Sequence, residues 1–251
     1  MVVGATGQTG RRVLQQMLLS QECHAIGGVR NEWGAKRLSQ ECTVFRGFQR
    51  TTVPAVTAPC LEIRQTDVIT MTDEDLRQAL LGVDTLVITT GMVASPRTLG
   101  NPFLLHRQAR AVDCVGTQRL IDAAKQAGTV RKVVLLSSIL TNARHWNQTS
   151  APGFFITNLL GNVLDRKLEA EQYLRASGLE YTIVRAAELT SPQPQAESST
   201  AEVVVCAEDT LNGGTISRDL VASVCVECAL SDKNHKYSNQ VIEIHQRMKN
   251  E

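Results

Sequence analysis

Three glycines near the start of the chain restrict the fold more than any other feature of the sequence. Gly4, Gly7 and Gly10 follow the apolar residues 1–3 and open a segment whose apolar residues recur at helical spacing. In such a unit the glycines allow a tight strand-to-helix turn, and they let a pyrophosphate approach backbone amides and the positive end of the helix dipole. The spacing and its context predict a βαβ unit that binds a dinucleotide rather than an ordinary glycine-rich turn.

The rest of the chain alternates apolar, β-branched runs with segments of helical periodicity. Strands are predicted at residues 1–3, 24–29, 83–89, 132–136, 181–184, 203–206 and 240–244, with a third strand ending near residue 65. Helices are predicted at residues 9–19, 104–127, 163–177 and 217–230. Because a parallel connection usually needs a helical crossover, this order predicts an α/β fold, a Rossmann-type, doubly wound, mostly parallel sheet with helices on both faces.

The length of 251 residues is typical of one such domain, so residues 1–251 are predicted to form a single NAD(P)-binding Rossmann domain. Proline-containing segments at residues 46–59, 92–102 and 191–201 interrupt the periodic pattern. The segments near 92–102 and 191–201 fall where such a domain builds its substrate cover. The segment at 46–59 precedes the third strand and is predicted to be an insertion.

The composition excludes several classes of protein. Hydrophobic residues make up 43%, charged residues 20%, and the formal net charge is +1, so neither disorder nor a nucleic-acid partner is expected. The longest apolar stretch, residues 83–93, contains Asp84 and three threonines, so a soluble chain with no transmembrane segment is predicted. Seven scattered cysteines, an odd number, indicate reduced thiols in a reducing compartment.

The first predicted strand is short. Only three residues precede Gly4, whereas a strand usually has about five. We therefore expect the natural chain to begin earlier, and a cleaved targeting segment or a trimmed N-terminus would each explain the short strand.

The end of the second strand distinguishes between two cofactors. An acidic residue there would hold the ribose hydroxyls of NAD, whereas a basic residue would accept the 2′-phosphate of NADP. Arg30 lies twenty residues after Gly10, which is the expected interval, and a guanidinium can hold a phosphate by two hydrogen bonds. Arg30 therefore predicts NADP, although an arginine at a strand end is also commonly a solvated charge.

Residues after the third and fourth strands are further candidates for cofactor binding. Asp67 would accept a hydrogen bond from the adenine amino group, with Val68 against the ring, or Asp67 would simply cap a loop. Thr89 and Thr90 end the fourth strand, where small residues let the cofactor backbone pass close.

The fifth strand and the helix after it supply the candidates for chemistry. Ser137 and Ser138 end the strand, and Lys167 lies on the helix beside the apolar line of Leu164 and Leu168. Lys167 would hydrogen-bond the nicotinamide ribose, or it would be one more solvated charge on a charge-rich helix. Periodicity alone favours the solvated charge.

Two patterns do not predict a metal site. Cys225 and Cys228 form a Cys-x-x-Cys pair, but they lie inside a predicted helix with no second pair to complete zinc ligation, so buried thiols are expected. The five histidines show no metal-ligand spacing, and no Gly-x-Ser-x-Gly elbow occurs. We predict neither a metal centre nor a serine hydrolase.

Five segments together resemble the atypical short-chain dehydrogenase/reductase family. Besides the glycine motif, they are Gly28-Val29-Arg30, Ile121-Asp122-Ala123-Ala124-Lys125, Arg166-Lys167 with Ala170-Glu171-Gln172-Tyr173-Leu174, and Tyr181-Thr182-Ile183-Val184-Arg185. Residues 215–221 are similar to the family's late segment. Within the family, the chain resembles plant and cyanobacterial NAD(P)H-binding proteins related to the redox-sensing component of the chloroplast import translocon, and more weakly flavin and biliverdin reductases.

The resemblance implies bound NADP(H), a chloroplast location and a possible protein partner in a plastid complex; a cytoplasmic location is the alternative. It implies cofactor contacts at Thr6, Gly7, Gln8, Thr9, Arg30, Asp67, Val68 and Thr89. It also lifts Lys167 above the reading as a solvated charge, supports Lys167 and Ser138 as catalytic candidates, and supports Ser137 and Lys167 as cofactor contacts.

The chain departs from the family at one position that matters for chemistry. Ordinary short-chain dehydrogenases carry a proton-donating tyrosine four residues before the lysine, and Val163 stands there in this chain. A standard alcohol dehydrogenase is therefore not expected. Two functions remain, a reductase of a flavin, quinone or tetrapyrrole-like acceptor, and a non-catalytic NADP-binding redox sensor or assembly subunit.

Overall fold

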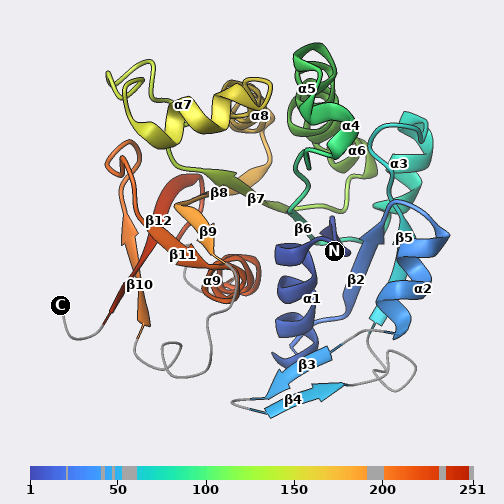
Figure 1. The fold of residues 1–251 in the computed structure, drawn as a ribbon. Coiled ribbons are helices and arrows are strands. Elements are labelled where there is room, and N and C mark those ends of the chain that lie inside the picture. The colour runs from blue at the N-terminus through green and yellow to red at the C-terminus, as the bar shows by residue number, and fades with distance from the viewer. Residues whose placement is uncertain are drawn as a thin grey trace.

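The computed structural model describes residues 1–20, 22–40, 43–46, 49–52, 61–190, 201–231 and 236–248. Its main sheet has eight strands in the order β10-β12-β8-β7-β6-β1-β2-β5 (Figure 1). The strands are β1 Val2–Val3, β2 Ala25–Val29, β5 Leu61–Gln65, β6 Thr85–Ile88, β7 Lys132–Ser138, β8 Glu180–Ala186, β10 Ala201–Cys206 and β12 Gln240–Met248. All neighbours pair in parallel except β10, which runs antiparallel to β12.

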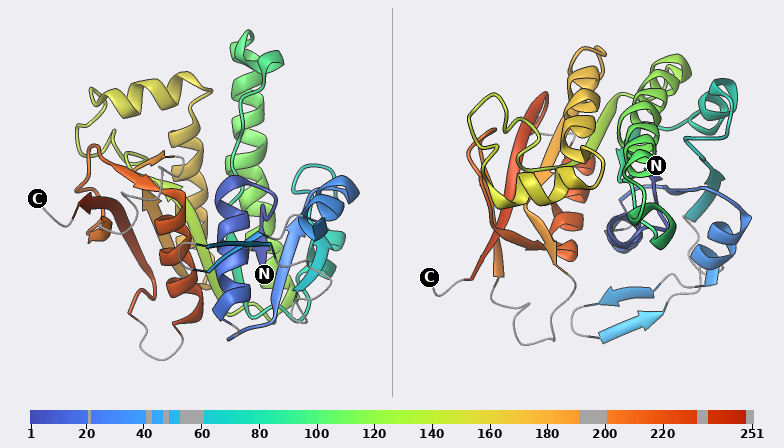
Figure 2. Two further views of the ribbon diagram at one scale, coloured as in Figure 1. Left: turned by 60° about the horizontal axis from the view of Figure 1, so that its bottom comes forward. Right: turned by 45° about the horizontal axis from the view of Figure 1, so that its top comes forward.

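Helices cover both faces of this sheet, as the two views in Figure 2 show. On one face lie α1 (Gln8–Ser20), α2 (Glu32–Gln40) and α9 (Arg218–Leu230). On the other lie α3 (Asp73–Ala79), α6 (Thr117–Ala127) and α8 (Val163–Arg175). The predicted Rossmann-type fold is confirmed. None of the described helices is long and apolar enough to cross a membrane.

The long helix predicted at residues 104–127 has an internal irregularity. It begins as α5 (Pro102–Ala109), continues as a π-helical segment, η2 (Arg110–Gly116), and ends as α6. A π-helical turn inserts an extra residue, so the side chains before it are rotated relative to those after it. Hydrophobic periodicity could predict the helix but not this change of register.

The three proline-containing segments that interrupt the periodic pattern differ in their structure. The segment 46–59 contains β4 (Gln49–Thr52), which pairs antiparallel with the preceding β3 (Thr43–Arg46) in a ribbon separate from the main sheet. Residues 53–60 lie outside the described part. The segment at 92–102 contains the short helix α4 (Pro96–Leu99). Residues 191–200, most of the other predicted cover segment, lie outside the described residues. Further short elements are α7 (Pro152–Leu159) and the parallel pair β9 (Glu188–Thr190) and β11 (Thr215–Ser217).

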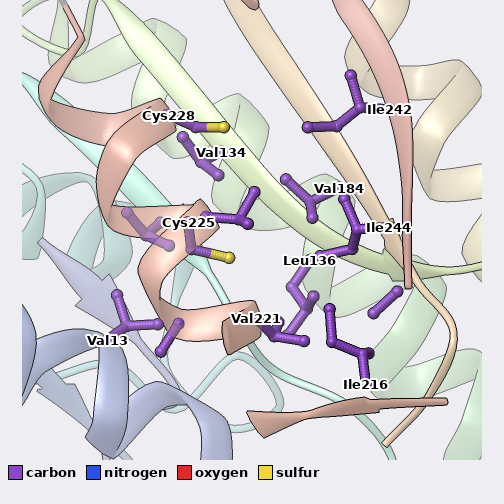
Figure 3. Packing of buried hydrophobic residues seen from close by; sticks show 14 of the residues in the cluster. Val13, Val134, Leu136, Val184, Ile216, Val221, Cys225, Cys228, Ile242 and Ile244 are labelled. Carbon is purple, nitrogen blue, oxygen red and sulfur yellow. The ribbon is translucent and has the colours of Figure 1, made fainter. Parts of the chain in front are cut away.

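The Cys-x-x-Cys pair lies in the hydrophobic core between α9 and the sheet (Figure 3). Both side chains have no exposed surface, and all cysteines in the described residues are free thiols. Burial raises the pKa of Cys228 to about 12 and also raises that of Cys225. These thiols are therefore buried packing residues, as predicted.

A buried ion cluster joins α8 to β8, to β12 and to the residues that follow β10. The guanidinium of Arg185 on β8 is 1% exposed and lies 2.7 Å from carboxylate oxygens of both Glu171 and Asp209. Glu243 on β12, fully buried, approaches it at 3.4 Å, and Glu208 at 3.2 Å. Burial by itself lowers the pKa of Arg185, but the facing carboxylates outweigh this effect and raise the pKa. The cluster is stable only while every charge keeps its partners.

We expect Arg185→Leu to be strongly destabilising, because it leaves Glu171 and Glu243 buried without their cation. The predicted loss is about 3–5 kcal/mol in the free energy of unfolding, measured by urea denaturation. Arg131→Leu is the control, because Arg131 and Asp84 form a surface pair with both side chains 73% exposed. The control should lose less than about 1 kcal/mol. Equal losses in the two variants would contradict the assigned role of the cluster.

Candidate functional site

The glycine turn brings the N-terminus of α1 onto the ends of two strands. Gly4 has a φ of +87°, a conformation that favours glycine, and an ideal Cβ on Gly10 would lie 2.3 Å from the Gly4 oxygen and 2.4 Å from Thr89 Oγ1. Such distances leave no room for any side chain. The amide of Gly7 donates to the Gly4 oxygen at 2.9 Å, which closes the turn.

This turn lies at the point where the strand order reverses. β1 has β2 on one side and β6 on the other, so the strand order reverses here. At such a reversal, sheets of this kind form a ligand-binding crevice beyond the carboxyl ends of the strands. Thr89, after β6, fixes the crevice by donating both its N–H and its hydroxyl to the Val3 oxygen, at 3.0 and 2.9 Å. Gly7 and Gln8 are exposed at the helix N-terminus, where the first amides have no partner within the helix. The geometry suits an anionic ligand.

Arg30 stands at the end of β2, beside this turn. Its side chain is exposed, and no hydrogen bond or ion pair is recorded for its guanidinium among the described residues. Its backbone oxygen accepts a hydrogen bond from Gln65 Nε2 at 3.3 Å. Arg30 can therefore bind a phosphate without breaking an existing contact, and its selectivity for NADP stays a prediction.

Asp67 and Val68 follow β5, and both already have structural contacts. The Asp67 carboxylate accepts the Ile69 N–H at 3.0 Å and the Thr70 hydroxyl at 2.7 Å, so it caps its own loop. Val68 is buried and packs close to Gly116 on η2. Each carboxylate oxygen has two lone pairs, so the loop-capping contacts leave room for the predicted adenine contact.

Within the described part of the chain, two threonine hydroxyls at the crevice lack hydrogen-bond partners. Thr66 Oγ1, after β5, and Thr90 Oγ1, after β6, are buried and unpaired. Leaving a buried hydroxyl unpaired costs about 1–3 kcal/mol, so such atoms commonly mark a ligand contact. Thr90 was a predicted cofactor contact. Thr66 was not, although it lies in the quoted Gln65-Thr66-Asp67-Val68 segment.

Lys167 is not the solvated charge that periodicity favours. Its side chain is 19% exposed, and its ammonium lies 3.0 Å from Oδ1 of Asp113, which is fully buried on η2. The two groups form an ion pair, but their angles do not meet those of a hydrogen bond. The other carboxylate oxygen of Asp113, Oδ2, accepts a hydrogen bond from the Met92 N–H at 3.0 Å. The ammonium also lies 3.8 Å from an ideal Cβ on Gly91, so Lys167 reaches the end of β6.

Sequence analysis missed Asp113. The only available signal was its place between Ala111 and Val115 of the predicted apolar line, and Asp113 is one of two acidic residues in residues 104–127. The π-helical segment decides its direction, because the altered register brings Asp113 toward Met92 and Lys167. The neighbouring Cys114 is no nucleophile, since burial and the adjacent Glu169 raise its pKa to about 12.

The two serines at the end of β7 have different environments. The Ser137 hydroxyl is buried and donates to Glu171 of the ion cluster at 2.5 Å. This bond accounts for its hydroxyl, so its predicted cofactor contact would require breaking a buried, charge-assisted bond. Ser138 is partly exposed, with no recorded side-chain partner in the described residues, and its catalytic role stays a prediction.

A model of the NAD(P)H-binding family matches residues 4–232. The chain belongs to this family. It is 37% identical over 244 residues to an uncharacterised chloroplastic protein of Arabidopsis thaliana, covering 97% of this chain and 75% of the relative. It is 31% identical to the chloroplastic protein TIC 62 of Oryza sativa subsp. japonica, covering 96% of this chain but only 44% of the relative. Sanguinarine reductase of Eschscholzia californica is 35% identical over 120 residues, 46% of this chain and 39% of the relative.

Solved structures of oxidoreductases share the fold of this NAD(P)H-binding family member. The oxidoreductase ylbE of Lactococcus lactis superimposes with a TM-score of 0.70 at 20% identity, over 98% of this chain and 90% of the other. ChuY, an anaerobilin reductase of Escherichia coli O157:H7, gives a TM-score of 0.66 at 18% identity, over 97% and 95%. At these identities the likeness concerns the fold alone.

The buried Lys167–Asp113 pair of this family member predicts non-additive mutations. Asp113→Asn leaves a mostly buried cation and Lys167→Met leaves a buried anion, so each single change should cost about 3 kcal/mol in the free energy of unfolding. The double variant leaves no unpaired charge and should lose clearly less than the sum. Urea denaturation of the four proteins in a double-mutant cycle measures this coupling. Additive losses would show that the two side chains do not act as a pair.

Proposed function

We propose that this protein binds NADPH along the crevice and reduces an electron-poor acceptor, a flavin, a quinone or a tetrapyrrole-like molecule. The observation that carries the proposal is the place of Lys167, held by Asp113 at the end of β6, next to the glycine turn. An ammonium carries three N–H donors, and Asp113 faces only one side of the Lys167 ammonium. Donors therefore remain for the hydroxyls of a ribose.

The proposed contacts would run along the whole length of a dinucleotide. The N-terminus of α1 would hold the pyrophosphate, Arg30 the 2′-phosphate and Asp67 the adenine. The unpaired hydroxyls of Thr66 and Thr90 would gain partners. These residues fit NADPH, which when bound supplies the hydride.

The tyrosines do not replace the missing proton donor. Val163, at the expected position in the first turn of α8, is 8% exposed and apolar. The hydroxyl of Tyr173 donates to Asp122 on α6. Tyr181 begins β8 and Tyr237 precedes β12, so both lie at the amino ends of parallel strands, opposite the crevice. An acceptor that takes a proton from water, as the proposed classes can, fits this site better than an alcohol or ketone.

A second function is a non-catalytic NADP-binding redox sensor or assembly subunit. The missing tyrosine and the similarity to TIC 62 favour it, and both relatives named as chloroplastic support a plastid location for this chain. A protein partner in a plastid complex belongs to this second proposal.

A panel assay distinguishes the two functions. Purified protein is first titrated with NADPH by tryptophan fluorescence, and NADPH oxidation is then followed with FMN, a short-chain quinone and biliverdin. Oxidation above the protein-free background with any acceptor supports the reductase, and Lys167→Ala should lower that rate. If NADPH binds but is not oxidised with any of the three acceptors, the proposed reductase function is wrong and the non-catalytic sensor remains.

Arg30→Asp tests the choice of cofactor. We expect NADPH affinity to fall about 10- to 100-fold, because a charge-assisted contact is lost and a like charge faces the 2′-phosphate. NADH affinity should change by less than about threefold, since NADH lacks that phosphate. Arg131→Asp, the same charge change at an exposed residue just before the amino end of β7, is the control. A parallel loss for both cofactors would remove Arg30 from the phosphate site.

A further inference from the structure

A cavity lies beside the predicted adenine contacts of the crevice and shares Val68 with them. It has a volume of about 680 Å³ and lies between the loop after β5 and the outer side of α5 and η2. Small-molecule sites are commonly of about 300–1,000 Å³. Nothing in the proposed reductase chemistry uses this space.

Large apolar side chains of the cavity are exposed to water. Phe103 is 73% exposed, Ile69 is 49% exposed and Val115 is 39% exposed, and all three line the cavity. Scattered exposed apolar residues are ordinary, but a group of them around one concave surface is typical of a binding site. An apolar ligand would remove this surface from water, at about 25 cal/mol per Å².

The ionisable side chains that line the same cavity are three arginines and a histidine, with no carboxylate among them. Arg119 is fixed by Asp73 and by the backbone oxygens of Val68 and Met71, and His106 contacts Arg166 at 3.0 Å. Arg107 and Arg110, unlike Arg119 and His106, have side chains without such contacts in the described residues. Both are exposed, and the described part of the chain records no hydrogen bond or ion pair for either guanidinium.

We propose that this cavity binds a small amphipathic anion, an apolar chain or ring system that carries one carboxylate. The apolar body would cover Phe103, Ile69 and Val115, and the carboxylate would take the free donors of Arg107 and Arg110. A second copy of this chain fits poorly, because two such surfaces would bring arginines against arginines. The basic rim favours an anion, and a cavity of this volume suits a small molecule.

The position of the cavity would connect such a ligand to the cofactor. Val68 lines the cavity and, in the proposed function, also contacts the adenine. The cavity itself is argued from its own lining and does not depend on hydride transfer. Its test therefore measures binding with and without NADPH, and it needs no catalytic activity.

The test uses 11-(dansylamino)undecanoic acid and its methyl ester as fluorescent probes. We expect the acid to bind at least tenfold more tightly than the ester, because only the acid can pair with the arginines. Arg107→Glu should weaken the acid about tenfold and leave the ester unchanged. Phe103→Ala should weaken both probes. Lys125→Glu, an equal charge change on an exposed residue of α6 outside the cavity, should change neither.

Three results would overturn the proposal. One is equal binding of acid and ester to the unmodified protein, and another is an acid affinity that Arg107→Glu leaves unchanged. The third is competitive displacement of the acid by NADPH, which would make the cavity the adenosine end of the cofactor crevice. Retained NADPH affinity in Arg107→Glu shows that this variant is folded, and it separates failure here from failure of the proposed reductase.

Discussion

The contact between the N-terminus of α1 and the ends of β1 and β6 is the constraint on which the rest of the structure depends. Gly10 leaves no space for a Cβ against the Gly4 oxygen and Thr89, so the helix dipole ends directly over the crevice. Thr89 then ties β6 to β1 through the Val3 oxygen. This contact sets the strand order on both sides and decides where an anionic cofactor can lie.

Two ionic contacts fix α8 relative to that crevice. Lys167 pairs with Asp113, and Glu171, one turn later, pairs with Arg185 and accepts the Ser137 hydroxyl. Both involve buried charges, which are stable only with their partners in place. The helix therefore has little freedom to slide, and the lysine ammonium is held at the end of β6. This rigid placement is what a group that orients a cofactor requires.

Much of this arrangement could be predicted from the sequence, because local patterns carry it. The glycine spacing, the alternation of apolar runs and the position of Arg30 after β2 are all readable from neighbouring residues, and they give the fold and the crevice. Asp113 and Thr66 were not predictable in the same way. Their roles depend on residues far away in the chain, and the π-helical segment that aims Asp113 leaves no periodic signal.

The sequence by itself determined a dinucleotide-binding α/β fold and the absence of the family's tyrosine, since Val163 stands in its place. Tertiary structure alone decided which polar residues are free to bind. It placed Ser137 on a buried carboxylate and gave Lys167 a buried partner, and it left Arg30, Arg107 and Arg110 without recorded partners in the described residues. The physical reason is that burial and pairing depend on which distant elements meet, and a charge becomes available to a ligand only where no such element neutralises it.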